Sequence, residues 1–70
     1  MQNTNQLLAA TEGNLKTMAE RGPNASQQSV MRQIRQYMDQ AKEAADQGDP
    51  QRAHNLALKA HLLSLDLLKH

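Results

Sequence analysis

The chain has 70 residues, no cysteine, one aromatic residue and a formal net charge of +1. This length allows one small domain, and the lack of cysteine excludes disulfides and thiolate metal sites. There is no basic block of the kind that binds phosphate backbones, and no apolar run near the ~20 residues of a membrane span. The N-terminus also lacks the charged and apolar regions of a signal peptide. We expect one soluble domain over residues 1–70 and leave its compartment open.

The first predicted helix, residues 4–21, has a thin apolar stripe interrupted by glycine. Gly13 costs ~1 kcal/mol relative to alanine, whereas each buried Leu or Met contributes ~1.5–3 kcal/mol. The helix can therefore dock, either on its own chain or in competition with a second copy. Its predicted core positions are Leu7, Leu8, Thr11, Leu15, Met18 and Ala19.

Two short segments, RGPN at residues 21–24 and QGDP at residues 47–50, divide the chain. Glycine closes a helix in the left-handed conformation, and proline cannot extend the helix before it. Asp49 and Pro50 in turn suit the cap and the first position of a following helix. We therefore predict an all-α, antiparallel three-helix bundle, up-down-up, with helices at residues 4–21, 25–47 and 50–69.

The second predicted helix has two candidate N-caps, Asn24 and Ser26, and Gln27 follows Asn24 at the spacing of a capping box. Its apolar face ends in small side chains that meet small side chains of the third helix across the short turn. This predicts a close antiparallel hairpin, the firmest part of the fold. The apolar positions of the second helix are Val30, Met31, Ile34, Tyr37, Met38, Ala41, Ala44 and Ala45, and the facing alanines are Ala53, Ala57 and Ala60.

The third predicted helix is apolar on two sides. One stripe contains Ala53, Leu56, Ala60, Leu63 and Leu67, and Leu58, Leu62 and Leu65 form a second one on another face. A helix with two apolar sides needs two covers. The second helix is one, and the first helix or another copy of the chain is the other. We predict a protein interface at Leu58, Leu62 and Leu65, flanked by His54 and His61.

The sequence predicts no catalytic, metal-binding or cofactor-binding residues. His54 and His61 lie seven residues apart, about 10.5 Å along a helix, which is too far to chelate one ion. They are interpreted as partly exposed side chains beside a packed seam, or as part of a pH-sensitive interface. Asp66 lies on a different face from His61 and Ser64, so no Ser-His-Asp relay forms. We expect neither an enzyme nor a small-molecule substrate.

The stretch AADQGDPQRAHNLALKA, within residues 34–67, resembles a hairpin of the tetratricopeptide repeat family. Ala41 stands at the small position of the first helix, Gly48 and Asp49 at the turn, and Ala53 and Ala60 at the two alanines of the second helix. The family's aromatic residues and closing proline are missing, and no second repeat precedes the match. The resemblance implies a tight hairpin and protein binding. A generic helical hairpin is the alternative.

These features favour a non-enzymatic helical module for protein–protein interaction or assembly, one that associates with itself. One alternative is a weak nucleic-acid-binding domain, using Arg32, Arg35 and Lys42, although acidic residues are interleaved with them. Another is a structural domain without a ligand, in a protein of bacterial type. The chain is also interpreted as the C-terminal piece of something longer. The expected partner is a protein, with no membrane contact.

Overall fold

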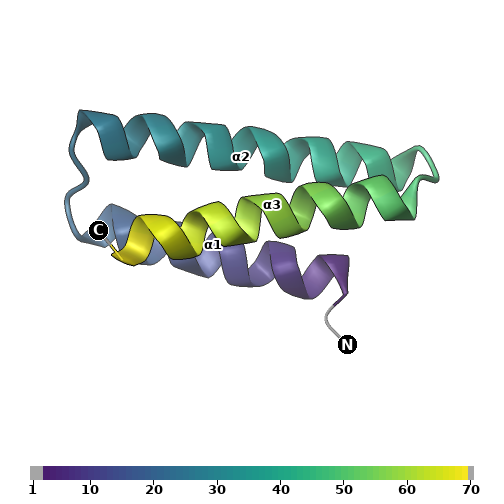
Figure 1. Cartoon of the computed structure of the whole chain (residues 1–70), viewed down its shortest axis with the longest axis horizontal. Helices are drawn as coiled ribbons and strands as arrows, with labels where there is room; N and C mark the ends of the chain where they lie inside the picture. Colours follow the sequence, from purple (N-terminus) through teal and green to yellow (C-terminus); the bar gives the residue numbers. More distant parts are fainter. Residues whose placement is uncertain (1–2, 70) are drawn as a thin grey trace.

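The computed structural model describes residues 3–69. Three α-helices, α1 (Thr4–Glu20), α2 (Ala25–Asp46) and α3 (Pro50–Lys69), make up nearly all of this part, which contains no strand. The chain runs up, down and up again, so that α2 is antiparallel to both α1 and α3 (Figure 1). The predicted three-helix bundle is confirmed. Its helix ends differ by one residue at Arg21 and Gln47, which are C-caps.

The two first helices begin in the same way. Asn3 Oδ1 accepts a hydrogen bond of 2.8 Å from the backbone N–H of Gln6, and Gln6 Oε1 accepts one of 3.2 Å from the N–H of Asn3. Asn24 and Gln27 repeat this exchange at 2.8 and 2.9 Å. Each box satisfies two backbone donors that a helix start leaves without partners. The predicted box at Asn24 is confirmed, and the box at Asn3 uses the same Asn-x-x-Gln spacing.

Glycine ends both of these helices. Gly22 and Gly48 have φ values of +69° and +80°. After α2, the N–H of Gly48 donates to the Ala45 carbonyl and that of Asp49 to the Ala44 carbonyl, the two bonds of a Schellman motif. Asp49 Oδ1 then accepts from the N–H of Arg52 at 3.1 Å and caps α3. One short turn therefore ends α2 and starts α3. Because the turn is so short, the two helices must lie side by side and antiparallel.

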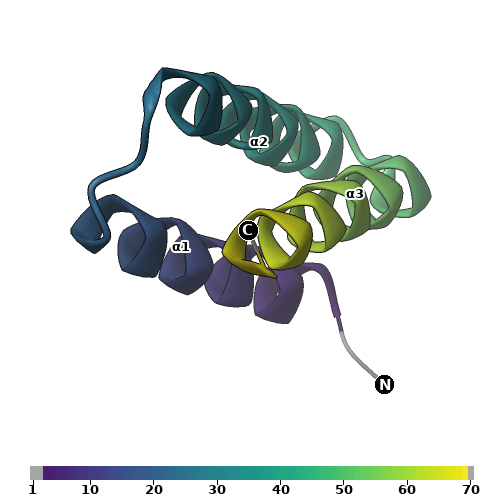
Figure 2. The same cartoon turned by 60° about the vertical axis from the view of Figure 1, so that its left-hand side comes forward.

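Helix α3 is the centre of the bundle. It packs against both α2 and α1, whereas α1 and α2 make little contact with each other. Figures 1 and 2 both show α3 lying alongside each of the other two helices. Helix α1 thus docks within its own chain, as one of the two predicted arrangements has it. It covers the side of α3 that carries Ser64, however, and leaves exposed the stripe of Leu58, Leu62 and Leu65 that was predicted to need this second cover.

The core joins small residues of α3 to large residues of its neighbours. The inner face of α3 buries Ala53, Ala57, Ala60, Ser64 and Leu67. The buried side chains of α1 are Leu7, Leu8, Thr11, Leu15 and Met18, and those of α2 are Met31, Ile34, Met38, Ala41 and Ala44. Because most of the α3 side chains are short, both neighbouring helices can approach its backbone closely.

Two of the predicted apolar positions lie outside the core. Ala45 of α2 and Ala19 of α1 are both exposed. Helix α1 begins short of the turn between α2 and α3 (Figure 1), so no third helix covers Ala45 at that end. The facing alanines of the hairpin are therefore Ala41 and Ala44, without Ala45.

Gly13 lowers the stability of α1 relative to alanine, and nothing in the structure requires glycine there. A Cβ added there meets nothing within 4 Å, and the helix continues through it to Glu20. We expect Gly13→Ala to stabilise the protein by about 0.5–1 kcal/mol, because glycine loses more backbone entropy on folding. Urea denaturation followed by circular dichroism measures the change. Gly48→Ala is the matched control and should destabilise, since its φ of +80° disfavours any side chain.

Candidate protein interface on helix α3

The outer face of α3 carries an apolar stripe that no other part of the described chain covers. Leu58, Leu62 and Leu65 are 38%, 55% and 40% exposed, and they are the exposed large hydrophobic side chains of residues 3–69. Successive members are four and three residues apart, so they lie along one side of the helix. Docking of α1 buries a different side of α3. The three leucines are therefore left uncovered in the single chain.

The α1 edge of this stripe is polar. The Thr11 hydroxyl donates to the Leu7 carbonyl at 2.7 Å, and its oxygen lies 3.5 Å from Nδ1 of His61. His61 and His54 are both half-buried. His61 thus fills the boundary between α1 and the leucine stripe, as a side chain beside a packed seam.

Two further contacts hold α1 to α3. Asn14 Nδ2 donates to Ser64 Oγ at 3.0 Å, and Ser64 Oγ donates to the His61 carbonyl at 2.7 Å. At the other end, the Arg21 guanidinium donates to the Leu68 carbonyl at 3.1 Å, one of the backbone acceptors that a helix end leaves open. Ser64 is 1% exposed and fully bonded. It was not among the predicted core positions, although it lies four residues after Ala60 on the same face.

Charged side chains form the opposite, α2, edge of the stripe. Lys59 and Asp66 are exposed and seven residues apart on α3. The Lys59 ammonium lies 4.7 Å from the centre of the Tyr37 ring of α2, a cation–π distance. Asp66 also has a contact within the chain. The leucine stripe is therefore bounded by polar contacts of His61 on one side, and by Lys59 and Asp66 on the other.

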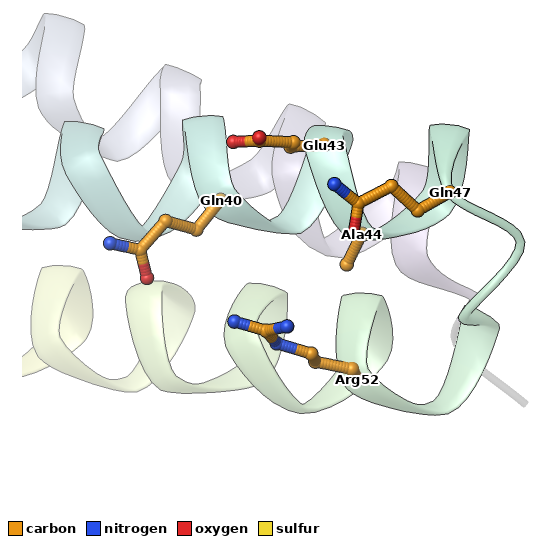
Figure 3. A pocket seen from close by; sticks show the side chains of 5 residues that line it. All are labelled: Gln40, Glu43, Ala44, Gln47 and Arg52. Carbon is orange, nitrogen blue, oxygen red and sulfur yellow. The ribbon is translucent and has the colours of Figure 1, made fainter.

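One depression lies elsewhere on the surface of the described residues. A shallow depression of about 100 Å³ lies between α2 and α3 near their turn, lined by Gln40, Glu43, Ala44, Gln47 and Arg52. Figure 3 shows the Glu43 carboxylate pointing along α2 instead of toward Arg52. Ligand pockets usually measure roughly 300–1,000 Å³. Within residues 3–69, no cluster of three histidines or carboxylates is placed to hold a metal ion.

No helix in the described part of the chain is both long enough and apolar enough to cross a membrane. No family model matches the chain, and no curated protein or solved structure does so. The function must therefore be inferred from the surface of the chain itself, where the exposed leucines of α3 are the main apolar feature.

Proposed function

We propose that this chain is a non-enzymatic assembly module that associates with a second copy of itself through Leu58, Leu62 and Leu65. The observation that carries the proposal is the exposure of these three leucines in one stripe on the central helix. A helix that presents apolar residues at spacings of four and three suits another helix with the same pattern. The turn spacing that resembles a tetratricopeptide hairpin favours protein binding as well.

A second copy is the simplest partner for this surface. In a two-fold pair the same patch is used twice, so one interface covers the exposed leucines of both chains. Small domains also gain from association, because a chain of this length buries a modest apolar core by itself. Three leucines per chain make a small interface, so we expect a dimer that dissociates at low protein concentration.

Leu62→Glu tests the proposal directly. Leu62 is the most exposed of the three and lies at the centre of the stripe, so a carboxylate there would be desolvated in the dimer. We expect the wild-type chain to shift from monomer to dimer between roughly 1 μM and 1 mM, and the variant to stay monomeric with unchanged helicity. Light scattering and circular dichroism measure the two properties.

Gln36→Glu is the control, because it adds the same charge at an exposed position of α2. It should leave dimerisation unchanged. If the wild-type chain remains a monomer over the whole range, or if Leu62→Glu dimerises as well as wild type, the leucine stripe is not a self-association surface.

A further inference from the structure

Two charged side chains beside the leucine stripe, Lys59 and Asp66, favour one orientation of the two α3 helices in a dimer. Lys59 precedes Leu62 by three residues, and Asp66 follows it by four. Seven residues are close to two full turns, so the two charges lie on the same flank of the stripe. The structure confirms that this is the α2 flank, because Lys59 reaches the Tyr37 ring.

The direction of pairing decides what these charges face. In an antiparallel pair with a two-fold axis near Leu62, the α2 flank of one helix lies beside the α2 flank of the other, and positions before the axis meet positions after it. Lys59 then faces Asp66 of the second copy, and Asp66 faces its Lys59. Leu58 and Leu65 lie four residues before and three after Leu62, so an axis near Leu62 also brings them opposite each other, with each pair offset by about 1.5 Å along the helix.

A parallel pair gives a different result. Its two-fold axis runs along the helices, so the α2 flank of one copy faces the α1 flank of the other. Lys59 and Asp66 would then lie opposite His54 and His61, and the two opposite charges would not meet each other. The antiparallel pair alone makes the surface complementary to itself in charge.

We infer that the dimer of the proposed function, on which this inference rests, is an antiparallel α3–α3 pair with reciprocal Lys59–Asp66 contacts between the two copies. Both side chains already have contacts within their own chain. They are nevertheless exposed, and an ammonium offers three donors while a carboxylate accepts several hydrogen bonds. The cross-chain pairs therefore add to the contacts within each chain and select one orientation.

A charge exchange between two variants tests the orientation. Lys59→Glu alone places two carboxylates opposite each other, and Asp66→Lys alone places two ammonium groups opposite each other, twice in each antiparallel dimer. We expect each variant to dimerise about tenfold or more weakly than wild type at low salt. In an equimolar mixture every facing pair is again of opposite charge, so a heterodimer should form with near wild-type affinity. Sedimentation equilibrium gives the dimer dissociation constant of each single variant. Energy transfer between separately labelled chains measures how much heterodimer forms in the mixture.

Two controls keep the result specific. Circular dichroism shows whether each variant is folded, and Lys42→Glu, an equal charge change on α2, should leave dimerisation within about twofold of wild type. If both α3 variants dimerise as strongly as wild type, the antiparallel geometry is wrong. The same follows if the equimolar mixture does not regain dimerisation. In either case the self-association itself stands. A wild-type chain that never dimerises would overturn both proposals.

Discussion

Replacing Leu15 by alanine is expected to remove a large part of the stability of the bundle. Leu15 is fully buried, on the face of α1 that packs into the core. Truncating a buried leucine costs about 2–5 kcal/mol, because transfer free energy is lost and a cavity remains. At roughly 0.05–0.15 kcal/mol per residue, a domain of this length has about 3.5–10 kcal/mol in total. Urea denaturation followed by circular dichroism should show a strongly lowered midpoint.

Leu62→Ala is the matched control, since it makes the same chemical change at a position that is 55% exposed. In dilute solution, where the chain is monomeric, it should cost less than about 1 kcal/mol. The contrast measures whether α1 is docked in the single chain. Equal effects of the two substitutions would mean that α1 does not pack on α3 as described.

Ala60→Leu is expected to destabilise the bundle by about 1–3 kcal/mol, through crowding instead of a cavity. Ala60 is fully buried on α3, the helix that contacts both neighbours. A larger side chain there must push α1, α2 or both away from the central helix. The same denaturation experiment measures the loss, and a lower slope with denaturant would report a less compact native state.

Ala45→Leu is the companion variant, because Ala45 is an exposed alanine of α2. Leucine and alanine differ little in helix propensity, so stability should change by less than about 0.5 kcal/mol. A bundle that accepts leucine at Ala60 as easily as at Ala45 would contradict the central position of α3. The pair also tests the finding that α1 begins short of the hairpin turn.

Local chemistry made the helix boundaries predictable. The Asn-x-x-Gln boxes and the turn QGDP act between residues at most five positions apart, so they need no information about the rest of the fold. The leucine stripe of α3 was predictable for a related reason. Helical periodicity alone places Leu58, Leu62 and Leu65 on one side and the alanines on another.

The sequence by itself therefore determined the three helices, their ends to within one residue, the α2–α3 hairpin and the apolar stripe of Leu58, Leu62 and Leu65. Only the tertiary structure decided that α1 lies along α3, that Ala45 stays outside the core, and that Ser64 is buried against Asn14. Periodicity shows that a face is apolar but not which neighbour covers it. That choice depends on the lengths and directions of helices that meet only after the chain has folded, with α1 beginning short of the hairpin turn.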